Sequence, residues 1–250
     1  GGMMTTVQDL GRTGYQSQGF SVSGVMDVRS FKIANLLLDN PENEAVLEFT
    51  LIGATLEFTS ETIISITGGD FRPQINGKPA KMYTAIYMHR GDILTFGGAR
   101  TGTRGYIAFS SYLDVPVVMG SRSTNIKCQI GGYKGRKLED DLSRSLDLDE
   151  FDQEKITLRV VMGPQEKMFT KEGRETFLNS EYTVTSEFDR MGCRLEGPFI
   201  AYKTTSDIIS DGIAFGSVQV PSHGKPIILL ADRQTTGGYA KIATVISVDI

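Results

Sequence analysis

A segment near the carboxyl end of the chain gathers side chains that could do acid–base and oxyanion chemistry. Residues 231–244 hold a carboxylate, a guanidinium, an amide, hydroxyls and two adjacent glycines. Apolar runs flank this segment, and we expect residues 226–230 and 242–248 to form buried strands. Polar groups at strand ends, beside glycines that let a ligand approach the backbone, are typical of a small-molecule site. The alternative is an ordinary glycine turn with polar side chains at the surface.

Each polar group of this segment has a chemical role that it could fill. Asp232 could serve as a general base. The groups that could stabilise an oxyanion are the side chains of Gln234 and Thr235 and the backbone N–H groups of Gly237 and Gly238. Lys241 could orient a substrate carboxylate. The sequence alone does not place these groups together in space.

A second candidate lies upstream, at Arg190. A guanidinium suits an anion or a polarised carbonyl oxygen, so Arg190 is a predicted catalytic residue. The alternative is an ion pair of Asp189 with Arg190 or Arg194, which would contribute little at the surface.

Two loops nearer the amino end could also bind substrate. Arg122 and Ser123 lie in the hydroxyl-rich run 121–124, where a guanidinium suits a carboxylate or phosphate. The alternative is a surface loop whose hydroxyls cap its own turns. Ser23 and Asp27 precede a predicted helix, whose N-terminus could accept an anionic intermediate. Asp27 is explained equally well as the cap of that helix.

Asp9 and Arg12 form a further candidate pair. If both side chains are buried, their contact would be charge-assisted. We favour a structural role, in which the pair fixes the N-terminal loop. The glycines around it do not form a dinucleotide-binding fingerprint, because a strand followed by a helix is not predicted there.

Composition limits the class of protein. The chain has 250 residues, of which 40% are hydrophobic and 22% charged, as is ordinary for a soluble globular protein. A net charge of −4 and a pI near 5.3 argue against nucleic acid as the main partner. No apolar run approaches the ~20 residues of a membrane-spanning helix, so no membrane is expected.

The few cysteines and histidines exclude other classes of site. Two cysteines cannot form a disulfide scaffold, and two histidines are too few for a typical His-rich metal site. We therefore expect no metal and a cytoplasmic location. The sequence has no GxxxxGK[ST] phosphate loop and no biotin-carrying segment, so ATP or biotin would be brought by another chain.

Short β-rich runs between glycines predict a mainly β fold. The predicted strands cover residues 46–52, 55–59, 62–67, 81–89, 92–96 and 105–110, and Asn76-Gly77 marks a hairpin turn. One helix is predicted from Val28 to about Leu38, with Phe31 and Ala34 on its apolar face. A second is predicted over residues 164–178, with proline near its start.

An acidic, glycine-poor stretch over residues 138–154 interrupts this pattern and predicts an exposed loop or linker. We therefore divide the chain into an N-terminal β lobe (1–142), a linker (143–155) and a C-terminal β lobe (156–250).

Eight motifs in the same order carry a resemblance to one family. They are residues 6–16, 23–27, 120–124, 131–136, 189–192, 194–197, 216–221 and 231–244. On these motifs the chain is identified as a member of the biotin-dependent carboxyltransferase or allophanate hydrolase subunit 2 family, which includes KipA and the C subunit of 5-oxoprolinase. The resemblance implies two cyclophilin-like β-barrel lobes with a few short helices. It also implies further residues beyond both ends and near Leu142.

The resemblance implies a reaction and partners. The first expectation is a subunit of a heteromeric, ATP-dependent 5-oxoprolinase that opens the lactam of 5-oxo-L-proline to give L-glutamate. Its partners would be the KipI-like B subunit, of related β-barrel fold, and the lactam-utilisation A subunit. ATP would act in the complex and not through a phosphate loop in this chain.

Two alternatives remain open within the family. One is a carboxyltransferase that acts on urea- or allophanate-type amides with carboxybiotin, which would require biotin. The other is a non-catalytic regulator that binds a KipI-like kinase inhibitor. A prolyl isomerase is not favoured, because fold does not fix function.

Overall fold

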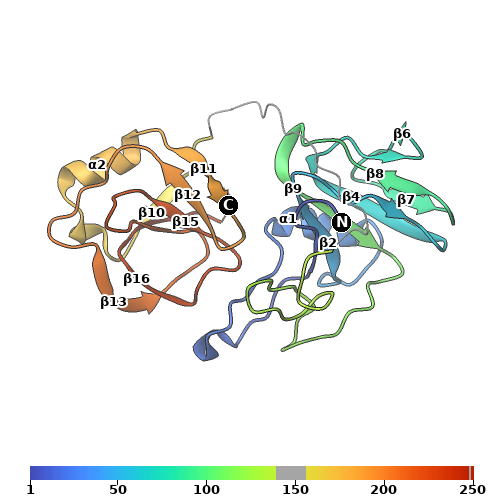
Figure 1. Ribbon diagram of the computed structural model, residues 1–250, viewed down its shortest axis with the longest axis horizontal. Coiled ribbons are helices and arrows are strands. Elements are labelled where there is room, and N and C mark those ends of the chain that lie inside the picture. Colours follow the sequence, from blue (N-terminus) through green and yellow to red (C-terminus); the bar gives the residue numbers. More distant parts are fainter. Residues whose placement is uncertain (139–155, 248) are drawn as a thin grey trace. The chain divides into compact units, whose positions relative to one another are not determined.

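The computed structural model describes residues 1–138, 156–247 and 249–250, which fall into two compact units (Figure 1). The first unit holds Gly1–Thr13 and residues 23–138, and the second holds Gly14–Val22 and the described residues from 156 onward. The predicted linker, 143–155, lies outside the described residues, so the three-part division stays a prediction. The predicted mainly β class is confirmed.

The first unit contains a 5-stranded antiparallel sheet in the order β1-β2-β9-β4-β7. Its strands are β1 (Thr6–Gln8), β2 (Val46–Thr50), β4 (Thr62–Asp70), β7 (Ala85–Met88) and β9 (Thr101–Phe109). A 4-stranded sheet in the order β3-β8-β5-β6 accompanies it. Its strands are β3 (Leu56–Glu57), β5 (Gln74–Ile75), β6 (Lys78–Pro79) and β8 (Ile93–Thr95).

The core of this unit lies between its strands and holds large apolar side chains. Phe49, Ile64 and Ile107 are fully buried, and the Phe49 and Phe71 rings meet edge-on at a centroid distance of 4.9 Å. The predicted hairpin turn is confirmed, because Asn76 and Gly77 both have positive φ between β5 and β6. Two successive residues in this region of φ are typical of a type I′ turn.

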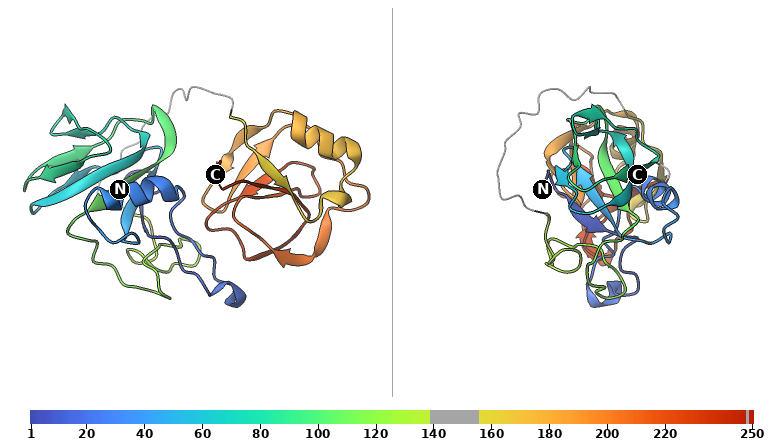
Figure 2. Two further views of the ribbon diagram at one scale, coloured as in Figure 1. Left: turned by 180° about the vertical axis from the view of Figure 1, so that it is seen from behind. Right: turned by 90° about the vertical axis from the view of Figure 1, so that its right-hand side faces the viewer.

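Helix α1 (Val28–Leu36) lies along the first unit's sheet (Figure 2). Asp27 caps it, since one carboxylate oxygen accepts from the Ser30 backbone N–H at 2.9 Å. Phe31 and Ala34 are fully buried, as predicted. The Ser65 hydroxyl on β4 donates to the Ala34 carbonyl at 2.7 Å, which fixes the helix to the sheet.

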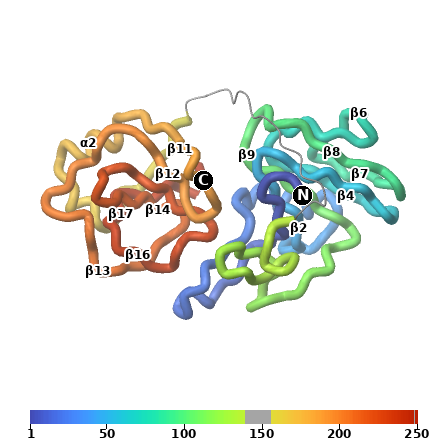
Figure 3. Tube along the Cα trace, viewed as in Figure 1, coloured from blue at the N-terminus to red at the C-terminus, as the bar shows by residue number. Residues whose placement is uncertain are grey.

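The second unit contains a 6-stranded antiparallel sheet in the order β10-β17-β14-β15-β12-β11 and a 2-stranded ribbon, β13-β16 (Figure 3). The sheet strands are β10 (Val160–Met162), β11 (Thr183–Phe188), β12 (Gly192–Glu196), β14 (Ser217–Gln219), β15 (Ile227–Leu229) and β17 (Lys241–Val245). The ribbon strands are β13 (Asp207–Gly212) and β16 (Thr236–Tyr239). Short 3-10 turns cover Gln16–Gln18 and Glu166–Met168.

The prediction of one helix over residues 164–178 was wrong at its start. The 3-10 turn ends at Met168, and α2 (Lys171–Asn179) begins only after Thr170, whose hydroxyl accepts from the Gly173 backbone N–H at 2.9 Å. Phe169 lies between the two, in extended backbone, and is fully buried. Burial of this aromatic ring against Tyr202, at a centroid distance of 4.5 Å, interrupts the helix that the apolar spacing predicted.

None of the described helices is long and apolar enough to cross a membrane.

Candidate active site

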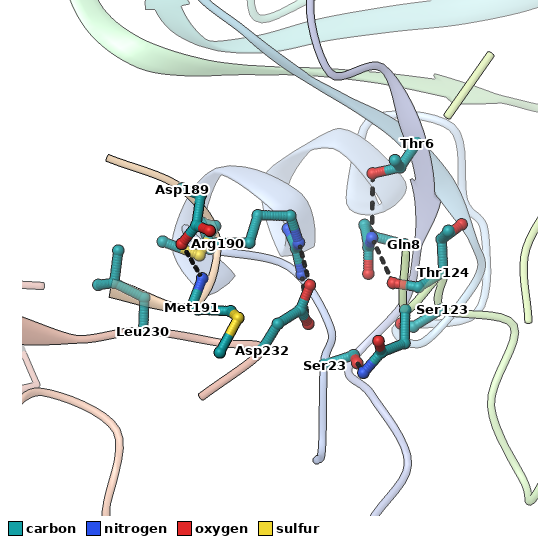
Figure 4. Close-up of polar contacts among 12 residues, drawn as sticks. Thr6, Gln8, Ser23, Ser123, Thr124, Asp189, Arg190, Met191, Leu230 and Asp232 are labelled. Carbon is teal, nitrogen blue, oxygen red and sulfur yellow. Dashed lines mark hydrogen bonds and ion pairs between the residues drawn. The ribbon is translucent and has the colours of Figure 1, made fainter. Parts of the chain in front are cut away.

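A buried ion pair between Arg190 and Asp232 joins two loops of the second unit (Figure 4). Arg190 Nε lies 3.0 Å from Asp232 Oδ2, and a second guanidinium nitrogen lies 3.5 Å from Asp232 Oδ1. The two side chains are only 3% and 6% exposed. The loops are also joined through their backbones, because the Asp232 N–H donates to the Arg190 carbonyl at 2.8 Å. This geometry makes the pair a clamp between loops.

The two residues of this clamp, Asp232 and Arg190, were both predicted to be catalytic. Both oxygens of Asp232 face the guanidinium, so the guanidinium of Arg190 holds a carboxylate of the protein itself. The general-base role of Asp232 and the anion-binding role of Arg190 stay predictions. The contacts give both side chains a positioning role.

The loops held by this clamp border a pocket of about 410 Å³ within the second unit. Its lining combines apolar side chains with amides, guanidinium groups and carboxylates. The residues that line it are Ser186, Glu187, Phe188, Asp189, Met191, Gly192, Arg194, Ile213, Gln219, Ile227, Leu229, Arg233 and Gln234. An apolar cavity with a few convergent polar groups is the usual form of a small-molecule site.

Asp189 is held in one orientation beside the pocket. Its Oδ1 accepts from the backbone N–H groups of Met191 at 2.7 Å and Gly192 at 3.0 Å, which closes a tight turn before β12 (Figure 4). Because these bonds use one carboxylate oxygen, the side chain can still present the other to a ligand. Among the described residues, Asp189 forms neither ion pair that the sequence offered as an alternative. Arg190 pairs with Asp232, and Arg194 pairs with Glu187 at 3.0 Å, on side chains that are both largely exposed.

Gly237 shapes the pocket although it does not line it. A Cβ atom at Gly237 would come within 2.7 Å of Gln219 Nε2 and 2.8 Å of Ile213 Cδ1. Both of those side chains line the pocket. At Gly238 the nearest atom to such a Cβ is a carbonyl oxygen at an ordinary 3.6 Å. The predicted oxyanion role of both glycines stays a prediction.

Of the other predicted residues of this segment, only Gln234 lines the pocket. Its side chain is exposed, whereas Thr235 is half-buried and its carbonyl accepts from the Ile213 N–H at 3.0 Å. Lys241 is buried, and its Nζ lies 2.9 Å from Asp211 Oδ2. That hydrogen bond, followed by one from Gln165, lowers the pKa of Asp211 from its ordinary value. Lys241 therefore orients a carboxylate of the protein, on β13.

The first unit has a buried polar cluster centred on Asp9. Asp9 Oδ1 accepts from the hydroxyls of Ser121 at 2.6 Å and Ser123 at 2.5 Å, and Oδ2 accepts from the Arg122 backbone N–H at 2.6 Å. The Ser123 hydroxyl also accepts from the Asp9 N–H at 2.9 Å. Ser123 is fully buried and its hydroxyl donates to Asp9, so its contacts within the described residues are structural.

The same cluster contains Arg12 and Ser23. Arg12 donates to the Ser123 carbonyl and, at 3.2 Å, to the Ser23 hydroxyl. Ser23 also accepts from Asn125 at 3.2 Å. A substrate role for Ser23 stays a prediction, and these bonds support the structural role that the sequence favoured for Arg12. Nearby, Gln8 donates to Thr6 and to the Thr124 carbonyl (Figure 4).

Two further predicted residues of this unit have different surroundings. Asp27 uses both carboxylate oxygens on Ser30, the second through the Ser30 hydroxyl at 2.5 Å, so its contacts are those of a helix cap. Arg122 is about one-third exposed and lies 3.7 Å from the Glu44 carboxylate. Arg122 and Asp27 are therefore half-buried, whereas Ser23 and Ser123 are buried.

Within the described part of the chain, no group of three or more His, Cys, Asp or Glu side chains is placed to hold a metal ion. Sequence reasoning gave no role to Gln219 or Arg233, which both line the pocket. Arg233 lies inside the motif 231–244 and could have been identified by its charge. Gln219 carries no comparable signal, because its place in the wall depends on the pairing of β14 with its neighbours.

Comparisons with known proteins agree with this architecture. Residues 18–250 match the family described as carboxyltransferase domain, subdomain A and B. The chain is 36% identical over 259 residues to the C subunit of 5-oxoprolinase from Escherichia coli, covering 100% of this chain and 84% of that protein. It is 37% identical over 254 residues to the C subunit of 5-oxoprolinase from Haemophilus influenzae, covering 98% and 82%.

The fold resembles that of a much longer solved protein. The crystal structure of the K. lactis urea amidolyase superposes with a TM-score of 0.88 at 30% identity, covering 99% of this chain. This chain corresponds to only 17% of that protein. The match over residues 18–250 and the identities above show that the chain belongs to the family of carboxyltransferase domains that comprise subdomains A and B.

Proposed function

We propose that this chain is the C subunit of a heteromeric 5-oxoprolinase, which hydrolyses the lactam of 5-oxo-L-proline to L-glutamate. Similarity to two proteins of that name over nearly the whole chain supports the assignment. The observation that carries it in the structure is the pocket of about 410 Å³ in the second unit. Its size and mixed lining suit a small, compact amide.

The pocket offers groups that match a lactam. The apolar lining residues Phe188, Ile227 and Leu229 can contact the ring methylenes, and the amides of Gln219 and Gln234 can bond the ring C=O and N–H. Hydrolysis adds water across the ring C–N bond, which leaves a new carboxylate and an amine. In this proposal Asp189, which is fixed through one oxygen, accepts or returns a proton through the other.

The Arg190–Asp232 clamp acts on this pocket indirectly in our proposal. It fixes the loops that carry Asp189 and Gln234, and so fixes the positions of these side chains relative to each other. Small displacements of groups that position a substrate can lower the reaction rate by a large factor.

ATP and the remaining catalytic groups come with the partners in this proposal. Lactam hydrolysis is expected to be coupled to ATP, and this sequence has no phosphate loop of its own. We assign ATP to the complex formed with a KipI-like β-barrel protein and a lactam-utilisation protein. The part played by this chain is to bind and orient the lactam.

A second candidate function is a carboxyltransferase half-site for urea-type amides, with carboxybiotin supplied by another chain or domain. The specific support for it is the fold match to urea amidolyase. Since this chain corresponds to only 17% of that protein, the match concerns one domain of a larger enzyme. The identity of 36% and 37% to proteins named as C subunits of 5-oxoprolinase favours the lactam.

Co-expression with the two partner proteins tests the proposal. We expect the purified complex to release glutamate from 5-oxo-L-proline when ATP is present, and to consume no ATP with urea. Carboxylation of urea by carboxybiotin in the same preparation, without glutamate release, would support the second function. Partner binding with neither reaction would instead support the regulator.

A further inference from the structure

Arg233 is the pocket residue whose surroundings point most clearly to a ligand. Its Nε donates to the Ile213 carbonyl at 3.0 Å, and one terminal nitrogen donates to the Leu230 carbonyl at 3.1 Å. The guanidinium also lies 5.7 Å from the centre of the Phe215 ring. These three contacts fix the plane of the group, while a guanidinium has five N–H donors in all.

The positive charge of Arg233 is not neutralised by the described part of the protein. Among the described residues, no carboxylate lies within 4.0 Å of its guanidinium nitrogens. Burial lowers the pKa of Arg233 from its ordinary value, yet an arginine stays charged at neutral pH. A partly desolvated cation bonded only to neutral carbonyls is electrostatically unfavourable until an anion joins it.

The two carboxylates that line the pocket bond groups other than Arg233, although Asp189 keeps one oxygen free. Glu187 is paired with Arg194 at 3.0 Å, on side chains that are 73% and 51% exposed, so water and salt screen that pair. Asp189 bonds the backbone N–H groups of the turn before β12. The pocket therefore offers Arg233 as its fixed cation.

We infer that Arg233 binds the carboxylate of an anionic amide substrate in the second unit's pocket, and so makes the site selective for 5-oxo-L-proline over neutral amides. This inference rests on the proposed function, because it names the residue that recognises the acid group of that substrate. A guanidinium can donate two parallel N–H bonds to a carboxylate, and the opposite charges strengthen both bonds. A neutral amide offers no negative charge to the guanidinium. Urea and other uncharged amides would leave the cation unneutralised.

The test compares an acid with its neutral counterpart. Binding of 5-oxo-L-proline and of 5-oxo-L-prolinamide is measured by calorimetry on the full chain, for the unchanged protein, Arg233→Met and Arg233→Lys. We expect Arg233→Met to weaken binding of the acid by about 10- to 100-fold. Binding of the prolinamide should change by less than about threefold, which also reports that the pocket is intact. Arg233→Lys should retain part of the preference for the acid.

Lys203→Met is the matched control, because it removes an exposed cation of the same unit that does not line the pocket. It should leave both affinities unchanged. Binding of neither compound, equal binding of both, or an equal loss of both in Arg233→Met would overturn the inference. Charge-selective binding without turnover in the assembled complex would instead reject the proposed function and leave the anion subsite standing. Glutamate release by the complex at the same rate with and without Arg233 would reject the anion subsite and leave the proposed function standing.

Discussion

At the scale of single residues, the buried pair Arg190–Asp232 is the contact on which the site most depends. Taking two charges out of water is costly, so removing one partner leaves an uncompensated charge inside the protein. Exposed pairs behave differently, because each partner is solvated when the other is lost. Loss of one partner should therefore lower the stability of the folded protein, and any effect on catalysis should follow from that loss.

Asp232→Ala should lower the free energy of unfolding by about 3–5 kcal/mol. The double variant Arg190→Met with Asp232→Leu should recover much of that loss, because no charge is then stranded. Glu187→Ala breaks the exposed pair with Arg194 and should cost at most ~1 kcal/mol. Urea denaturation followed by circular dichroism measures all three. A stable Asp232→Ala protein that has lost only its activity would contradict the clamp and support the general base.

Gly237 and Gly238 provide a matched pair of substitutions beside the pocket. A methyl group at Gly237 meets the ends of the Gln219 and Ile213 side chains at 2.7 and 2.8 Å, whereas at Gly238 it meets nothing closer than 3.6 Å. Gly237→Ala should lower kcat/KM of the assembled complex by about 10- to 100-fold, since it displaces two wall residues. Gly238→Ala should be nearly neutral. Equal effects of the two substitutions on glutamate release would refute this account of the pocket wall.

The two cysteines should differ sharply in reactivity. Burial raises the pKa of the Cys193 thiol to about 11, and Cys128 is exposed. At pH 8 only about one Cys193 in a thousand is then a thiolate, the form that attacks disulfide reagents. A thiol titration with a coloured disulfide at pH 8 should count one fast cysteine in the folded protein and two after unfolding. Rapid reaction of both in the folded protein would contradict the burial of Cys193.

At the scale of elements, the caps decide where the two helices begin. Asp27 and Thr170 each accept from the backbone N–H three residues on, at 2.9 Å. The first cap was predicted from its position before an apolar periodic run. The second was missed, because burial of Phe169 delays the helix and no local pattern announces that burial.

Asp27→Ala should destabilise the first unit by about 1 kcal/mol, through loss of the bonds to Ser30. Asp27→Asn should lose less, because the amide oxygen can still accept from the Ser30 N–H. Chemical denaturation of both variants checks this. Since the proposed site lies in the other unit, lactam binding by the calorimetric assay should be unchanged in both. A loss of binding in Asp27→Asn with full stability would favour the ligand role first considered for this residue.

Most strands of the first unit were predicted from the sequence, whereas the strands between residues 160 and 219 and the partners of the polar residues were not. The hairpin at Asn76-Gly77 is local, because two adjacent residues with positive φ suffice to specify it. Asp232 meets Arg190 across a separation of 42 residues, and Lys241 meets Asp211 across 30. Such pairs depend on strand order and register, which residue types alone do not fix. Sequence analysis therefore identified residues with suitable chemistry, but in the structure several of them form ion pairs with other residues of the protein.

At the scale of the whole chain, two units divide the candidate chemistry between them. The first holds a buried polar cluster around Asp9 that stabilises its own loops. The second holds the pocket, with one fixed cation and two amides in its wall. The proposed function, in which this chain binds and orients a lactam and its partners bind ATP, assigns a role to this pocket.

The most direct test of this account is an add-back experiment. A preparation of the two partner proteins without this chain is given 5-oxo-L-proline and ATP, and the purified chain is then added in increasing amounts. We predict no glutamate at the start, and a rate that rises with the added chain until it saturates. Glutamate release that is already complete without this chain, or none at any amount of it, would contradict the proposed function.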